Sequence, residues 1–171
     1  MKIETYKHCY VVRGFFSPEL QGKIKTMANK IEETKVYRTD NPKRHSLINY
    51  PSLMKVHRFI QNDIENIVNE KLKPSYTYYS NYLPGADLVE HKDRELCYMT
   101  VSYCLSQQKQ WPFYIEGKPY ILDENDAIIF KGQELAHYRE SNPYTCCMLL
   151  FHFVKPEYQG PLTPASSENY Q

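Results

Sequence analysis

Two histidines and one aspartate in this chain have the types and the spacing of a metal-binding set. His91 and Asp93 stand two residues apart, and His137 follows much later. Two imidazoles and one carboxylate hold a non-haem Fe(II) ion on one face and leave the opposite positions open to other ligands. Residues two apart on an extended strand project to the same side. We therefore expect His91 and Asp93 to share one ion, which a histidine from a later strand completes.

The elements that must position these residues begin with two helices. Ser17-Pro18-Glu19 is typical of a helix start, with Ser as N-cap, Pro at the first helical position and an acid in the first turn. Apolar residues at helical spacing follow it, and a second such series runs from Ser52 until Lys73-Pro74 ends it. A strand is predicted over Tyr6–Phe16, before the first helix. The segment Thr34–Pro51, between the helices, has no periodicity and is predicted to be a loop.

From Tyr76 onward the pattern changes to short strands. About eight of them are separated by turn signals such as Pro84-Gly85, Glu116-Gly117 and Asn142-Pro143. Two helices followed by such a series predict an α+β protein, mainly β, built as an antiparallel sandwich or jelly roll. We expect a single domain over residues 1–171, with helical support at 17–72, a β core at 76–154 and an extended tail at 155–171.

Composition excludes several function classes. The chain has 171 residues and a formal net charge of +1, so no overall field favours nucleic acid or an anionic membrane. No apolar run is long enough to span a bilayer, and the first residues lack the pattern of a signal peptide. Five cysteines without a C-x-x-C pair favour reduced thiols in a cytoplasmic setting.

An ordered series of motifs surrounds the three candidate ligands. It consists of Asn81-Tyr82-x-x-Gly85, His91-x-Asp93, the strand Thr100–Leu105, Trp111-Pro112, Asn125-Asp126-Ala127-Ile128-Ile129-Phe130 and His137-x-Arg139-Glu140. This series resembles the 2-oxoglutarate/Fe(II)-dependent dioxygenases, and among them the prolyl-hydroxylase-like branch. The resemblance covers residues 76–154, and the two preceding helices are also in the style of that family.

The resemblance implies a double-stranded β-helix, which is a distorted jelly roll, braced by the two helices. It implies Fe(II) at His91, Asp93 and His137, with 2-oxoglutarate and O₂ as co-substrates. The activity implied is hydroxylation of an unactivated C–H bond, in a peptidyl or free amino acid. Halogenating members of the superfamily have a small residue in place of Asp93, so Asp93 favours hydroxylation, or a demethylation that begins with it.

The chain departs from the family at the 2-oxoglutarate anchor. The family usually supplies an Arg or Lys about ten positions beyond the second histidine, and here that region is Thr145-Cys146-Cys147-Met148. Arg139 is the best substitute, because it lies two residues beyond His137 on the same face of a strand, and a guanidinium can bind a carboxylate through two hydrogen bonds. The alternative is that Arg139 pairs with Glu140 or another acid at the surface.

Other residues with chemical potential have more than one interpretation. Tyr82 could donate a phenol hydrogen bond to the same carboxylate, or it could serve packing alone. His152 lies in an apolar run and is expected to be a core or edge histidine rather than a ligand. Trp111 is expected to pack in the core rather than stack on a substrate.

The segment Thr34–Pro51 is the candidate for the substrate side. Its basic residues could face an acidic substrate, although a solvated surface loop is the simpler interpretation. They are Lys35, Arg38, Lys43, Arg44 and His45. Long loops in compact domains are usually functional or disordered. We therefore expect this one to lie near the mouth of the metal site and to close over substrate.

Two other classes of function compete with an oxygenase. A cupin-like metal-binding domain, without catalysis or with a different reaction, would use three or four clustered His and Glu ligands, and the second clustered histidine is missing here. A nucleic-acid-binding module could use the basic stretch Lys35–Arg58, but no known nucleic-acid motif accompanies it. A small molecule or a peptide is the expected substrate. Peptidyl proline, a free amino acid, a modified base and a lipid fragment all remain open, as does the oligomeric state.

Overall fold

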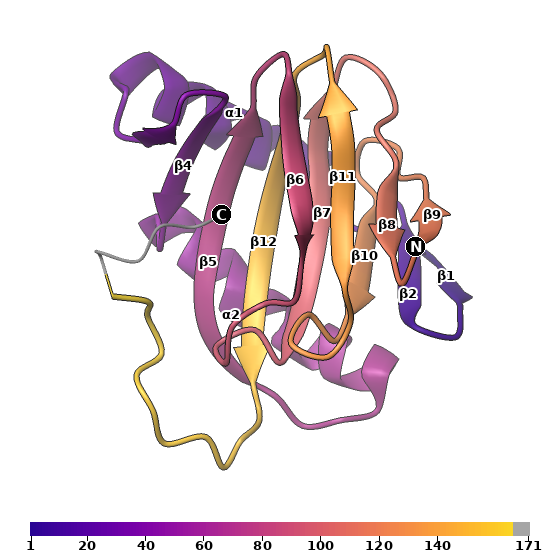
Figure 1. Cartoon of the computed structure of the whole chain (residues 1–171). Coiled ribbons are helices and arrows are strands. Elements are labelled where there is room, and N and C mark those ends of the chain that lie inside the picture. The colour runs from indigo at the N-terminus through magenta and orange to yellow at the C-terminus, as the bar shows by residue number, and fades with distance from the viewer. Residues whose placement is uncertain (166–171) are drawn as a thin grey trace.

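The computed structural model describes residues 1–165 and shows two antiparallel sheets with two helices against the larger one (Figure 1). The helices are α1 (Pro18–Thr34) and α2 (Pro51–Val68). The strands are β1 (Lys2–Thr5), β2 (Cys9–Arg13), β3 (Arg38–Asn41), β4 (Arg44–Ile48), β5 (Lys73–Tyr82), β6 (Ala86–His91), β7 (Met99–Gln107), β8 (Phe113–Ile115), β9 (Lys118–Tyr120), β10 (Ala127–Phe130), β11 (His137–Asn142) and β12 (Cys146–Val154). The α+β jelly-roll class predicted from the sequence is confirmed.

The larger sheet has the strand order β1-β2-β10-β7-β12-β5-β4-β3, and the smaller sheet has the order β6-β11-β8-β9. The smaller sheet lies over one face of the larger one, and the helices cover the other face (Figure 1). Since both faces of the large sheet are covered, its central strands are buried along almost their whole length. These strands therefore lack the polar-out alternation of a sheet with one solvated face.

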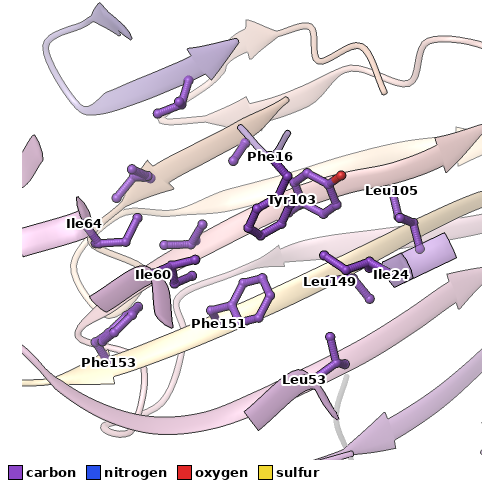
Figure 2. Close-up of a cluster of buried hydrophobic side chains, with 14 of the residues drawn as sticks. Phe16, Ile24, Leu53, Ile60, Ile64, Tyr103, Leu105, Leu149, Phe151 and Phe153 are labelled. Atoms are coloured by element: carbon purple, nitrogen blue, oxygen red, sulfur yellow. The ribbon is translucent and has the colours of Figure 1, made fainter. Parts of the chain in front are cut away.

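The main core lies between the helices and the large sheet. Figure 2 shows Phe151 and Phe153 of β12 among Ile60 and Ile64 of α2, and all four are almost inaccessible to solvent. Each buried side chain of this size contributes about 1.5–3 kcal/mol to folding. A second cluster fills the space between the two sheets. The two faces of β12 therefore belong to different cores, one against the helices and one between the two sheets.

Helix α1 begins as predicted and α2 ends earlier than predicted. The Ser17 hydroxyl accepts a hydrogen bond from the Leu20 N–H at 3.3 Å and caps α1. Helix α2 ends at Val68, because Asn69 takes the left-handed conformation with φ of 54°. The expected continuation to Lys73-Pro74 is wrong, since Lys73 and Pro74 already belong to β5.

Two further expectations about elements are corrected. The segment predicted as the strand Tyr6–Phe16 contains only β2, which pairs with the earlier strand β1. The segment Thr34–Pro51 is not a loop: it forms β3 and β4, and β4 pairs with β5. Pairing with a long buried strand supplies the order that the local pattern of this segment lacks.

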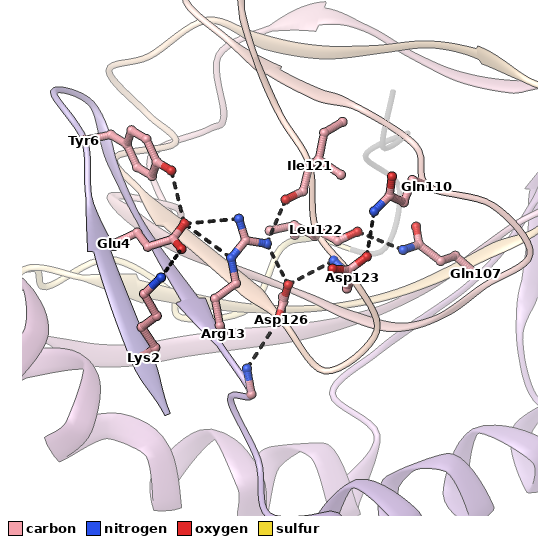
Figure 3. Close-up of polar contacts among 11 residues, drawn as sticks. Lys2, Glu4, Tyr6, Arg13, Gln107, Gln110, Ile121, Leu122, Asp123 and Asp126 are labelled. Atoms are coloured by element: carbon pink, nitrogen blue, oxygen red, sulfur yellow. Dashed lines mark hydrogen bonds and ion pairs between the residues drawn. The ribbon is translucent and has the colours of Figure 1, made fainter.

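The N-terminal hairpin is attached to the turn before β10 by a polar network (Figure 3). Arg13 pairs with Asp126 at 2.7 Å and with Glu4 at 3.1 Å, and it also donates to the carbonyl of Ile121. Asp126 in turn accepts the backbone N–H of Gly14 at 3.1 Å. This network joins β2 to the β9–β10 connection and closes one end of the large sheet.

The end of the chain is irregular where it is described. Residues 155–165 contain turns and bends but neither helix nor strand, and the rest of the predicted tail, 166–171, lies outside the described residues. All five cysteines are buried free thiols. None of the described helices is long and apolar enough to cross a membrane.

Candidate metal centre

His91 and His137 lie side by side at the ends of two paired strands. His91 is the last residue of β6, His137 is the first of β11, and the two are register partners. Their ring centroids are 4.3 Å apart. β6 and β11 are neighbours in the smaller sheet. Strand pairing alone therefore brings both imidazoles to one point.

The backbone determines which nitrogen of each ring faces the site. His91 Nδ1 donates to the carbonyl of Val89 at 2.7 Å, and His137 Nδ1 donates to the carbonyl of Leu135 at 2.8 Å. A carbonyl can only accept, so a proton lies on Nδ1, and Nε2 is left to bind an ion or, in a protonated ring, to donate a hydrogen bond. Both Nε2 atoms point to the same place. This is the tautomer that a pair of metal-binding histidines requires.

Asp93 supplies the carboxylate from a loop rather than from a strand. Strand β6 ends at His91, so the expected same-face projection along one strand does not apply. The Asp93 N–H donates to the carbonyl of Gly132 at 2.9 Å, and this bond folds the loop back. As a result, Asp93 Oδ1 lies 3.3 Å from Nε2 of both His91 and His137. Ligand atoms about 2.1 Å from one ion are roughly this far apart.

The charges of the three groups suit a divalent cation. Burial alone would raise the pKa of Asp93, but hydrogen bonds from His137 and His91 outweigh it and hold that pKa well below its usual range. Burial lowers the pKa of His91, and its bond to Asp93 reverses the effect, so the net pKa is raised. The carboxylate is thus ionised, and its negative charge beside two imidazoles suits a divalent cation.

Other side chains hold the second oxygen of Asp93. Thr100 Oγ1 lies 3.1 Å from Asp93 Oδ2 and 3.0 Å from His152 Nδ1. Because an ionised carboxylate only accepts, Thr100 donates to Asp93 and His152 donates to Thr100. Burial lowers the pKa of His152 to about 4, so its ring is neutral. His152 is the buried core histidine that was expected, with an added role in this chain of hydrogen bonds.

Gly132 is packed directly against the same carboxylate. A methyl group at Gly132 would overlap Asp93 Oδ2 and come within 2.7 Å of Thr100 Oγ1. Neither Gly132 nor Thr100 stands at ligand spacing in the sequence, so these contacts with Asp93 could not be predicted from it. Asp93, Cys97 and His152 form a second group of metal-capable atoms. Its members already bond to Thr100 and, through the Cys97 thiol, to Tyr76.

His91, Asp93 and His137 line a cavity of about 340 Å³ between the two sheets. This volume is within the range of small-molecule sites. Its wall combines tyrosines, apolar side chains and several cations, among them Tyr76, Tyr78, Tyr82, Phe113, Met148, Arg44, Lys92, Arg94 and Arg139. Asp93 is the single carboxylate among the described lining residues. The cavity therefore reaches the candidate metal position, and cationic side chains outnumber carboxylates on its described wall.

Arg139 lies inside this cavity and not at the surface. Its side chain extends over the rings of Trp111 and Phe113, with the guanidinium carbon 4.8 and 4.9 Å from their centroids. It donates to the carbonyl of Trp111 and contacts Met148 Sδ at 3.8 Å. Within residues 1–165 no carboxylate pairs with it, and this rejects the alternative of a surface pair with Glu140.

Tyr82 and Trp111 pack against each other, and Arg139 lies over the Trp111 ring. Tyr82 is buried on β5, and its ring meets that of Trp111 edge-on at 5.0 Å. The indole N–H of Trp111 donates to the carbonyl of Glu140 at 2.8 Å, so Trp111 is a core residue as expected. Tyr82 packs and also lines the cavity, so both interpretations of it remain open.

Comparison with solved structures identifies the fold. A prolyl 4-hydroxylase from Pseudomonas putida matches with a TM-score of 0.70 and 12% identity, over 87% of this chain and 94% of the other. An α-ketoglutarate-dependent non-haem epimerase, SnoN of nogalamycin biosynthesis, matches with a TM-score of 0.72 and 8% identity, over 86% and 78%. This chain has the fold of the 2-oxoglutarate-dependent non-haem iron enzymes.

A third match, with the same fold, contains ligands. HygX from Streptomyces hygroscopicus, with nickel, 2-oxoglutarate and hygromycin B bound, has a TM-score of 0.72 and 10% identity, over 88% of this chain and 83% of the other. These likenesses confirm the predicted structural resemblance, including its prolyl-hydroxylase-like branch. No protein-family model matches the sequence, and no curated protein matches it either. Because a hydroxylase and an epimerase share the fold, the reaction has to be argued from the site.

Proposed function

We propose that this protein is an Fe(II)- and 2-oxoglutarate-dependent oxygenase that hydroxylates an unactivated C–H bond of an amino acid or peptide. The observation that carries the proposal is the convergence of His91 Nε2, His137 Nε2 and Asp93 Oδ1 at the wall of a cation-lined cavity. Two imidazoles and a carboxylate on one side of an ion leave its other positions open to the cavity. Bound Fe(II) would supply the activation of O₂ coupled to the decarboxylation of 2-oxoglutarate.

Arg139 is the proposed anchor of the co-substrate. A buried guanidinium without a carboxylate partner is costly, because its charge has lost its water. Arg139 has this environment within residues 1–165, and it faces the cavity two residues beyond His137. A carboxylate that enters the cavity can take two parallel hydrogen bonds from it. The phenol of Tyr82 lines the same cavity and is proposed to help hold this carboxylate.

The test is 2-oxoglutarate turnover by the iron-loaded protein. Succinate release that requires Fe(II) and O₂ is expected from the natural chain, and His137→Ala should abolish it because one of three ligands is lost. His8→Ala is the matched control, since His8 lies outside the metal centre. If His137→Ala bound iron and turned over normally, the site assignment would be wrong. Metal binding without any 2-oxoglutarate turnover would instead indicate a cupin-like binding domain.

A screen of amino acids, peptides and nucleotides would then identify the primary substrate. We expect stimulation of succinate release by amino acids or peptides. Stimulation by nucleotides alone would contradict this part of the proposal, while leaving the oxygenase activity intact.

A further inference from the structure

The hairpin of β3 and β4 adds a side of the cavity that the two-sheet core does not supply. In the pairing of β4 with β5, Arg44 is the partner of Tyr82 and Ile48 is the partner of Tyr78. Tyr78 and Tyr82 line the cavity, so Arg44 on the same face of the sheet points into it as well. His45, on the opposite face, pairs with Glu32 of α1 at 2.8 Å.

Arg44 is held in a buried aromatic setting. It is 7% exposed, and its guanidinium carbon is 5.6 Å from the ring centroid of Tyr78 and 5.8 Å from that of Tyr82. Arg44 lines the same cavity as His91, Asp93 and His137. Arg44 is therefore a positioned cation that faces both the tyrosines and the metal centre.

The two cavity arginines belong to different walls. Arg139 comes from β11 and contacts Trp111, Phe113 and Met148. Arg44 comes from β4 and contacts the tyrosines of β5. One dicarboxylate bound between the metal and Arg139, with the phenol of Tyr82 beside it, does not need Arg44. The second wall contributes Arg44, and Lys92 and Arg94 line the same cavity. A cleft lined by one sign of charge concentrates ligands of the other sign.

We propose that Arg44 binds a carboxylate of the primary substrate, so that the substrate is an amino acid with a free α-carboxyl group. This inference rests on the proposed function and names the substrate of the same site. The guanidinium offers two parallel hydrogen bonds to the carboxylate. The rings of Tyr78 and Tyr82 provide apolar contact for the body of the molecule. Such a group occurs in a free amino acid and at the carboxyl terminus of a peptide.

The test measures binding, so it does not depend on turnover. The full chain is loaded with Mn(II) and 2-oxoglutarate, and thermal stabilisation is measured with three sets of probes. These are free amino acids, N-acetyl amino acids and N-acetyl amino acid amides. Since a charged hydrogen bond is lost in the amide, we expect at least one acid to bind about tenfold or more tightly than its own amide. Tight binding of the free amino acids alone would indicate a free amino acid as substrate. Tight binding of the N-acetyl amino acids would indicate the carboxyl terminus of a peptide.

Variants assign this preference to Arg44. Arg44→Gln should reduce the acid-to-amide ratio about tenfold, and Arg44→Lys, which keeps the charge and the packing of the stem, should reduce it less. Lys43→Gln is the matched control, because it removes the same charge from the next, exposed residue. If Arg44→Gln does not fold, the reduction of the ratio by Arg44→Lys, compared with the unchanged ratio of Lys43→Gln, decides.

Three results would overturn the inference. They are equal binding of every acid and its amide, an unchanged ratio in both Arg44 variants, and a loss of 2-oxoglutarate binding in place of a loss of acid preference. The last result would place Arg44 in the co-substrate site. Failure of the proposed function is a separate result, seen as the absence of Fe(II)-dependent succinate release from the natural chain.

Discussion

Asp93 is the residue whose position depends most on its neighbours. Its two histidine partners approach Oδ1, Thr100 approaches Oδ2, and the backbone of Gly132 lies behind the carboxylate. A carboxylate on a loop has no strand to define its direction. These contacts replace the strand, so Gly132 and Thr100 hold the carboxylate of this proposed metal ligand in place.

Gly132→Ala should therefore weaken Fe(II) binding. The added methyl group overlaps Asp93 Oδ2, and changes next to a ligand typically cost about 10- to 100-fold in metal affinity. Titration with Fe(II) under anaerobic conditions measures the effect. Gly22→Ala is the matched control, because a methyl group at Gly22 meets nothing within 4 Å. Equal affinities of Gly132→Ala and the natural chain would show that Gly132 does not position Asp93.

Arg139→Met should raise the concentration of 2-oxoglutarate needed for half-maximal turnover by tens-fold. The variant keeps the length of the side chain and removes a charged hydrogen-bond donor worth about 1.5–3 kcal/mol. Succinate release at varied 2-oxoglutarate and saturating Fe(II) measures this. Arg58→Met, at an exposed position on α2, controls for loss of charge. An unaltered requirement in Arg139→Met would mean that another residue binds the co-substrate.

At the scale of elements, the N-terminal hairpin depends on one ion pair. Asp126 is almost fully buried and accepts from Arg13, from Gly14 and from the N–H of Asp123 (Figure 3). Without the carboxylate, three donors lose their partner, one of them charged. The attachment of β1 and β2 to the sheet is thus expected to be sensitive to this residue.

Asp126→Ala should lower the free energy of unfolding by about 2–4 kcal/mol, because it leaves Arg13 without its buried partner. Urea denaturation followed by circular dichroism measures the loss. Asp123→Ala is a suitable control, since among residues 1–165 its carboxylate makes a single, exposed bond to Gln110, and the change should cost less than about 1 kcal/mol. Similar losses in both variants would argue against the role of the Arg13–Asp126 pair.

At the scale of the whole molecule, the helix layer contains a buried histidine that makes stability depend on pH. His57 of α2 packs edge-on against Phe153 at 4.5 Å. Burial, with a smaller contribution from His152, lowers the pKa of His57 from 6.5 to about 3. The unfolded chain binds a proton at this residue below pH 6.5, whereas the folded chain does not. The stability is therefore complete above pH 6.5 and is lost as the pH falls toward 3.

His57→Leu should make the protein less sensitive to acid. The natural chain is expected to lose about 1.4 kcal/mol per pH unit from this group below pH 6, and the variant should lack this component. Urea denaturation between pH 4 and pH 7 measures the slope, because the pKa of His57 is 6.5 in the unfolded chain and about 3 in the folded chain. His8→Leu, at a residue outside the helix layer, serves as the control. Parallel slopes for His57→Leu and the natural chain would contradict the assignment.

Local patterns in the sequence predicted a large part of this molecule. Ser17-Pro18 indicated the start of α1, because capping depends on a few adjacent residues. Short strands after Tyr76 indicated the jelly roll. The ligand types at His91, Asp93 and His137 indicated the metal centre, since coordination chemistry depends on residue type. Alternation along one strand placed Arg139 inside, and the structure agrees.

Other features depended on contacts between distant segments. The pairing of His91 with His137, the loop position of Asp93 and the support from Thr100 and Gly132 all arise from strand order and register. The hairpin that brings Arg44 into the cavity was predicted as a loop, because β4 gains its order from pairing with β5. Hydrophobic periodicity reports which face of a segment is buried, but strand pairing depends on hydrogen bonds between segments far apart in the chain. Sequence alone therefore indicated the proposed metal ligands, and the tertiary structure decided which cations share the cavity with them.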